Sequence, residues 1–370
     1  MAGQEPFVPL EIKPVGMYLC RPGESELLVI RPSGSGGTMS AITFRIDRTT
    51  PSTARSEDRP AVSTGTSSAD RYASLTTTVP KELVHRASVA EVMLTDWKRL
   101  ADDHFALTAQ WPRRHGFFLT TDDCHDPLIV AETIRQAGIL IGHAEYDVPL
   151  DYSFLMWDLA IEVRPQQIFV GTAPASLDIE VTCKDIKRRR GDLSGCRYEV
   201  LILRNGQVAA TGSARFTCVS PTVYRRLRTP RAESGIRCPI PLTAPLAPQN
   251  VGRLSPTDVV LSPHGLTDQW QLRVDTRHPV LFDHPVDHAP GMLLLEAARQ
   301  ATTAHLGRAC LPLSVTGEFI RYSELDAACT ISARSVPDPD RPHEERVLIT
   351  GEQEDELIFR AIVTVASSTV

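Results

Sequence analysis

The sequence of 370 residues lacks any run of about 18 consecutive apolar residues, so no transmembrane helix is predicted. Its first residues, MAGQEPFVPLEIKP, lack the basic segment and apolar core of a secretory signal. The eight cysteines form no CxxC pair, and we expect reduced thiols in a cytoplasmic protein. A surplus of basic residues is also missing, because the formal charge is −6, and this excludes a protein that binds nucleic acid through its net charge.

Composition divides the chain into four parts. Residues 1–72 are rich in Ser, Thr, Gly, Pro and Arg, a composition that cannot bury enough apolar surface to fold alone, and they are predicted to be a poorly ordered tail. Residues 229–250 are rich in proline and are predicted to be a linker rather than a helix or strand. The linker separates two expected domains, residues 73–228 and residues 251–370.

Two stretches of the chain are versions of one another. HDPLIVAETIRQAG, from His125 to Gly138, and HAPGMLLLEAARQA, from His288 to Ala301, share Glu-x-x-Arg-Gln-Ala, and the offset in sequence is the same for every matched pair. If each stretch is a helix, the residues that flank the shared ones are apolar on almost every face, which predicts two buried helices. The polar residues in question are Glu132, Arg135 and Gln136 in the first copy and Glu296, Arg299 and Gln300 in the second.

Residues at positions i and i+3 of a helix are neighbours, so each buried helix should hold a carboxylate beside a guanidinium. One interpretation is a structural ion pair that closes on itself, because buried ions require partners. The other interpretation is a catalytic pair. The loop before each helix is crowded with ionisable side chains, and this favours the catalytic interpretation.

The repeat extends beyond the helices. Val84–Trp97 resembles Val251–Ser262, at nearly the same offset as the two helices. Apolar residues alternate in segments that follow in each half, which predicts strands, and Asn205-Gly206 between two apolar runs predicts a hairpin. Each half is thus one long helix wrapped by an antiparallel sheet, which gives an α+β tandem hot-dog fold. The alternating segments are Phe105–Trp111 and Trp270–Thr276, and Ser153–Val163 and Val315–Tyr322 are further predicted strands.

The segment FDHPVDHAPGMLLLEAARQA, from Phe282 to Ala301, resembles the central helix of the β-hydroxyacyl-ACP dehydratases, in which the Glu aligned with Glu296 is catalytic. In those enzymes a loop histidine works with the acid, and His284 is its approximate match. Together with CHDPLIVAETIRQAGILIGHAEY and YSFLMWDL, the segment closely resembles the A-factor synthase family of bacterial γ-butyrolactone biosynthesis, from about Leu75 to Val370.

That resemblance implies transfer of a β-ketoacyl group from an acyl carrier protein to the hydroxyl of dihydroxyacetone phosphate. The reaction needs a base for the hydroxyl, a donor for the oxyanion and a cation for the phosphate. No Ser-His-Asp, Cys-His or Gly-x-Ser-x-Gly pattern is legible, which favours direct transfer. The resemblance implies Glu296, Glu132 and His284 as catalytic residues and Arg299, Arg135, His288, Gln300 and Gln136 as substrate-binding residues.

The second half is expected to carry more of the chemistry, because its loop has more histidines and lies closer to the dehydratase pattern. A metal at His284 and His288 is not expected, since Pro285 and Pro290 prevent a regular helix through them. We expect no cofactor, no membrane and no nucleic-acid partner.

Two other function classes stay open. The chain could be a dehydratase or thioesterase of the same fold, or a non-catalytic module that binds acyl groups. The two halves should pair within one chain, as a monomer or as a dimer of such chains. The basic run Lys187–Gly191 is a solvated loop or a docking point for an acidic carrier protein.

Overall fold

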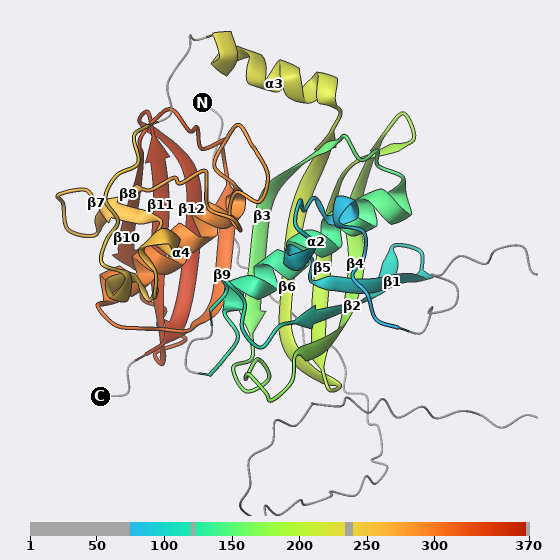
Figure 1. Ribbon diagram of the computed structural model, residues 1–370, viewed down its shortest axis with the longest axis horizontal. Helices are drawn as coiled ribbons and strands as arrows, with labels where there is room; N and C mark the ends of the chain where they lie inside the picture. The colour runs from blue at the N-terminus through green and yellow to red at the C-terminus, as the bar shows by residue number, and fades with distance from the viewer. Residues whose placement is uncertain (1–74, 120–122, 234–239, 368–370) are drawn as a thin grey trace, which may run out of the picture. The chain divides into compact units, whose positions relative to one another are not determined.

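A computed structural model describes residues 75–119, 123–233 and 240–367. The described residues form a twelve-stranded antiparallel sheet with two long helices, α2 and α4, in the order shown in Figure 1. The first half contains β1 (Leu94–Ala101), β2 (His104–Trp111), α2 (Pro127–Tyr146), β3 (Ser153–Val163), β4 (Ala175–Arg189), β5 (Asp192–Arg204) and β6 (Gln207–Val219). Then come α3 (Pro221–Glu233), β7 (Leu261–Pro263), β8 (Gln269–Leu272), α4 (Gly291–Leu306), β9 (Pro312–Phe319), β10 (Cys329–Ser335), β11 (Glu344–Gln353) and β12 (Glu356–Ala366).

Both repeated stretches form buried helices, as predicted. Helix α2 begins where the Asp126 side chain accepts a hydrogen bond from the backbone N–H of Leu128 at 2.9 Å, with Pro127 in the first turn. Helix α4 ends at Gly307, whose left-handed conformation suits a residue without a side chain. α2 packs on β3, β5 and β6, and α4 packs on β10, β11 and β12 (Figure 1), so each half has its own helix wrapped by strands.

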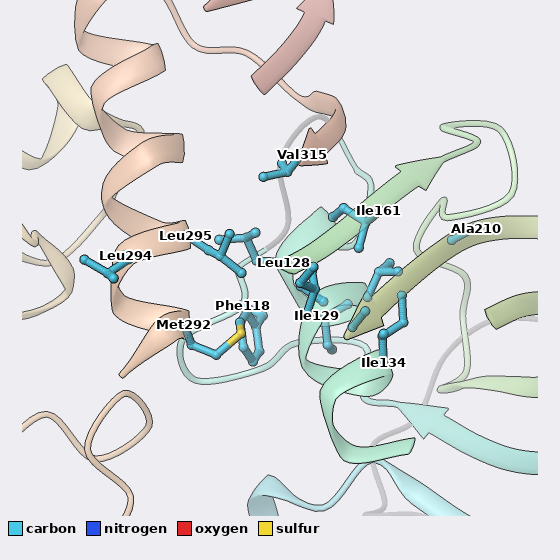
Figure 2. Packing of buried hydrophobic residues seen from close by; sticks show 14 of the residues in the cluster. Phe118, Leu128, Ile129, Ile134, Ile161, Ala210, Met292, Leu294, Leu295 and Val315 are labelled. Atoms are coloured by element: carbon cyan, nitrogen blue, oxygen red, sulfur yellow. The ribbon is translucent and has the colours of Figure 1, made fainter. Parts of the chain in front are cut away.

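The two halves share one sheet. The strand order is β1-β2-β4-β5-β6-β3-β9-β12-β11-β10-β8-β7, and β3 of the first half pairs with β9 of the second in antiparallel register. The predicted pairing of the two halves within one chain is therefore present. Figure 2 shows the apolar core at this junction, where Leu128 and Ile129 of α2 and Leu295 of α4 point toward the same region.

The hairpin prediction is confirmed. Asn205 and Gly206 both have positive φ, 51° and 73°, and join β5 to β6 by the two-residue turn that this dipeptide favours. Glu354 and Asp355 adopt the same conformation between β11 and β12. Equivalent hairpins thus close both halves.

Some boundaries differ from the prediction. Strand β8 ends at Leu272, earlier than Thr276, because the chain leaves the sheet toward the loop that precedes α4. Helix α3 extends to Glu233, into the segment predicted as a linker, and Arg231 in that part forms ion pairs with Asp326 and Glu354. The predicted tail, residues 1–72, lies outside the described residues.

Candidate functional site at the junction of the two halves

Glu132 of α2 lies at the centre of a buried ionic cluster. Its carboxylate accepts hydrogen bonds from Arg135 Nε at 2.9 Å, from Arg86 Nε at 3.0 Å and from Gln136 Nε2 at 2.6 Å. The side-chain oxygen of Gln136 also accepts a hydrogen bond from the backbone N–H of Met93. The predicted Glu–Arg–Gln group is thus assembled, with a second arginine, Arg86, added from the segment before β1.

Glu296 of α4 repeats this arrangement. It accepts hydrogen bonds from Arg299 Nε at 3.0 Å and from Arg253 Nε at 2.8 Å, and Gln300 Nε2 also donates to it at 2.5 Å. The Gln300 side-chain oxygen accepts a hydrogen bond from the backbone N–H of Val260, as the Gln136 oxygen does from Met93. The duplication has therefore preserved each cluster together with its second arginine.

The arginines hold both carboxylates in the charged form. Burial alone would raise the pKa of Glu132, but the charges of Arg135 and Arg86 outweigh it and lower that pKa to about 2. Arg253 and Arg299 likewise lower the pKa of Glu296 to about 2, against the effect of burial. Because hydrogen-bond donors occupy its oxygens, a carboxylate in such a cluster is poorly placed to accept a proton from a hydroxyl.

The second arginine of each cluster also ties the two halves together. Arg86 Nη1 donates to the backbone carbonyl of Val280 in the second half at 3.3 Å. Arg253 Nη1 donates to the backbone carbonyl of Phe117 in the first half at 2.7 Å. Each cluster therefore depends on a loop that belongs to the other half of the chain.

A cleft of about 1280 Å³ opens beside the first cluster but not beside the second. Arg86 and Arg135 line it, and the Arg135 side chain is 19% exposed. The second cluster is closed over: Glu296 is fully buried, and the side chains of Arg253 and Arg299 are 1% and 6% exposed. Among the described residues that line the cleft, none comes from the second cluster.

The loop before α4 forms another part of the cleft wall. Asp283 accepts hydrogen bonds from the backbone N–H groups of Ala87 at 2.5 Å and Ser88 at 3.1 Å, and so fastens this second-half loop to the first half. The neighbouring His284 lines the cleft with its side chain 46% exposed and Nδ1 3.6 Å from the Asp283 carboxylate. The structure thus brings His284 to the first cluster, at the junction of the halves, and not to Glu296 of its own half.

His288 lies farther along the same wall. Its Nδ1 is 2.8 Å from Asp287 Oδ1, and its ring packs edge-on against Tyr322 with centroids 4.9 Å apart. Helix α3 covers this end, because Arg228 donates to Asp287 at 2.9 Å and to Glu324 at 2.7 Å. His288 and His284 therefore occupy different parts of one cleft, and no group of three metal-ligating side chains occurs among the described residues.

The family model for the A-factor biosynthesis hotdog domain matches residues 67–220 and 237–368, which together span both halves. The chain belongs to this family. Within it, a 2-oxo-3-(phosphooxy)propyl 3-oxoalkanoate synthase of Streptomyces virginiae is 53% identical over 78% of this chain and 98% of its own length. A synthase of the same name from Streptomyces griseus is 42% identical over 76% of this chain and 94% of its own length.

The family fold has distant likenesses among solved structures. An acyl-ACP thioesterase from Bacteroides thetaiotaomicron covers 70% of this chain and 97% of its own, with 11% identity and a TM-score of 0.42. In the part of the chain that the structure describes, no helix is long and apolar enough to cross a membrane.

Sequence reasoning had missed Arg86 and Arg253 in this member of the A-factor family. A signal was present, because the aligned segments Val84–Trp97 and Val251–Ser262 begin Val-x-Arg in both copies. The pairing of each arginine with its glutamate joins residues that are distant in sequence, which helix periodicity does not reveal. An arginine shared by both copies of a repeat was the available indication.

Proposed function

We propose that this chain is an acyltransferase of the A-factor synthase type, which joins a 3-oxoacyl group to the free hydroxyl of dihydroxyacetone phosphate. The product is a 2-oxo-3-(phosphooxy)propyl 3-oxoalkanoate, as the names of its relatives state. The observation that carries this function is the 53% identity to a synthase of that name over 98% of its length. The acyl donor is a thioester, and an acyl carrier protein is the carrier we infer.

The first cluster supplies the cations for the phosphate of the acceptor. Arg135 Nε and Nη2 are engaged by Glu132, while Nη1 has no hydrogen-bond partner among the described residues. The guanidinium is fixed in orientation and borders the cleft, so one edge is available to a phosphate oxygen. Glu132 in this proposal holds the two arginines in place, and Gln136 holds Glu132.

The remainder of the cleft suits the acyl chain. Its walls carry apolar side chains of β3, β6 and α4, and the polar groups gather near the first cluster and near α3. An acyl chain along the apolar wall would place its thioester carbonyl near Arg135 and His284, where N–H donors can stabilise an oxyanion. The apolar residues that line this wall include Phe154, Met156, Phe216, Met292, Leu295 and Phe319.

This arrangement places the proposed active site beside the first cluster and not beside the second, where the sequence led us to expect it. The sequence favoured the second half, with Glu296 as base and Arg299 as phosphate ligand. The geometry supports a composite site instead, in which Arg135 of the first half and His284 of the second line the same cleft. Glu296, Arg299 and Gln300 then form the closed structural counterpart, while His288 lines the distal part of the cleft.

The proposal can be tested with purified protein and a 3-oxoacyl thioester, incubated with and without dihydroxyacetone phosphate. The products are identified by mass spectrometry. The phosphorylated ester is expected only with the acceptor present. Thioester hydrolysis or dehydration in its place would identify a thioesterase or dehydratase, and binding without turnover would identify an acyl-binding module.

The duplicated arginines provide a matched pair of variants for the site. Arg135→Lys keeps the charge but loses the planar fork, so the KM for dihydroxyacetone phosphate should rise by roughly tenfold or more. Arg299→Lys makes the same chemical change in the closed cluster and should leave that KM near the wild-type value. A larger effect from Arg299→Lys would return the site to the second half.

A further inference from the structure

Two histidines of the first half form a hydrogen-bonded pair beside the cleft. His143, in the last turn of α2, has Nδ1 2.7 Å from the backbone carbonyl of Val148 and Nε2 2.8 Å from Nε2 of His85. Since a carbonyl only accepts, Nδ1 of His143 carries a hydrogen. In the neutral ring Nε2 of His143 is then an acceptor, and His85 donates to it from its own Nε2.

This chain of hydrogen bonds fixes the tautomer of His85. Its hydrogen sits on Nε2, and Nδ1 keeps a lone pair with no hydrogen-bond partner among the described residues. His85 lines the cleft, and its ring packs edge-on against Phe154 with centroids 5.5 Å apart. Burial, followed by the influence of His143 and Arg135, lowers the pKa of His85 to about 3, so the ring is neutral near pH 7.

The second half serves as an internal comparison. His85 has a positive φ of 50° after the short helix Lys81–Val84, a conformation that disfavours side chains. Its equivalent, when the Val-x-Arg segments of the two halves are aligned, is Gly252, with a φ of 66° after the short helix Pro248–Val251. The equivalent of His143, when Glu132 is aligned with Glu296, is Gly307. The fold therefore does not need a histidine at either position, and the pair occurs only in the half whose arginine cluster borders the cleft.

We propose that His85 is the general base of the acyl transfer and that His143 is its positioning residue. The proposal rests on the function inferred above. Nδ1 of His85 takes the proton of the acceptor hydroxyl while that oxygen forms a bond to the thioester carbonyl carbon. The carbon–sulfur bond then breaks, and the departing thiolate receives the proton back from Nδ1.

The carboxylates of the two clusters are not placed to act as the general base. Glu132 accepts hydrogen bonds from two arginines and a glutamine, and Arg135 separates it from the cleft. The bound acceptor also assists His85, because a phosphate dianion on Arg135 adds negative charge nearby. Negative charge favours the protonated imidazole, so acceptor binding raises the pKa of His85 toward the working pH.

Substitution of His85 tests the assignment in the full-length protein. His85→Gly copies the residue that the second half carries at this position, so the fold should be retained, as checked by circular dichroism and thermal melting. The kcat for ester formation should fall by roughly 100-fold or more, with little change in the KM for dihydroxyacetone phosphate. Added imidazole should occupy the vacated space and restore part of the kcat with saturation.

Two further variants separate chemistry from packing. His85→Asn tolerates the left-handed backbone and fills more of the space, so it should lose a similar share of kcat without rescue by imidazole. His143→Asn should lower kcat less. His305→Asn, in the last turn of α4 and outside the cleft, is the matched control and should keep the wild-type kcat.

Two results of these assays would overturn the role of His85, and they can be told apart. A wild-type kcat in both His85 variants, or a loss in the folded His85→Gly protein that imidazole does not restore, overturns the assignment while the function stands. Wild-type protein that forms no ester in the same assay overturns the function and, with it, the role of His85.

Discussion

Glu296→Gln should destabilise the protein strongly while changing almost nothing in its shape. The substitution removes one buried negative charge and leaves Arg253 and Arg299 side by side, with the Asp126 carboxylate, 3.8 Å from Arg253 Nη1, as the nearby counter-ion that remains. The pKa of Glu296 is about 2 against an ordinary 4.5, and each unit of pKa corresponds to about 1.36 kcal/mol, so the loss is roughly 3 kcal/mol. Removal of one partner from a buried ion pair typically costs about 3–5 kcal/mol, in agreement with this value.

The pH dependence follows from the direction of the shift. Because the folded-state pKa is depressed, the stabilisation is complete above the ordinary pKa of 4.5 and is lost as the pH falls toward 2. The difference between wild type and Glu296→Gln should therefore be largest at neutral pH and should narrow below pH 4.5.

Urea unfolding followed by tryptophan fluorescence, at pH 7 and at pH 3.5, measures both quantities. A free-energy difference below about 1 kcal/mol at pH 7, or one that does not narrow in acid, would refute this account of the cluster. Glu132→Gln makes the same change in the first cluster and should also destabilise. Only that variant should weaken the binding of dihydroxyacetone phosphate, because it loosens Arg135 at the cleft.

Three further variants test the packing of α2, the anchoring of α3 and the role of the N-terminal tail. Gly138→Ala would place a methyl group against the ring of Tyr198, and should lower the unfolding free energy by about 1–3 kcal/mol in a urea titration; an unchanged value would mean that the ring moves aside freely. Arg228→Ala removes the hydrogen bonds from α3 to Asp287 and Glu324, so limited proteolysis should cut α3 sooner while the rest of the chain stays resistant; equal cleavage rates would contradict this anchoring role. A chain that begins at Ala73 should be soluble and active in the ester assay, and failure to fold would show that the predicted tail completes the fold.

The local features of this fold were predictable because they repeat at short range. A largely apolar run predicted β3 from Ser153 to Val163, the bounds that the structure has. The constant offset between the copies that hold Glu132 and Glu296 identified both buried helices and the residues beside each carboxylate. Such patterns arise within one helix or strand, and a single sequence contains them in full.

The composition of the cleft was not predictable in this way. Arg86 meets the carbonyl of Val280 across 194 residues of sequence, and Asp283 meets Ala87 across 196. Which cluster is open depends on how the loops close over Arg135 and Arg299, whose local sequences are nearly alike. The assignment of the chemistry to the second half rested on loop composition, which does not reveal the half that a loop faces.

The β3–β9 junction has a consequence for how such a site can arise. When two identical hot-dog chains pair, symmetry gives both clefts the same residues, and any side chain gained in one is gained in the other. Covalent fusion removes that constraint. One copy can carry a histidine where the other keeps Gly252. One half can therefore bind a second substrate while the equivalent part of the other half only stabilises the fold.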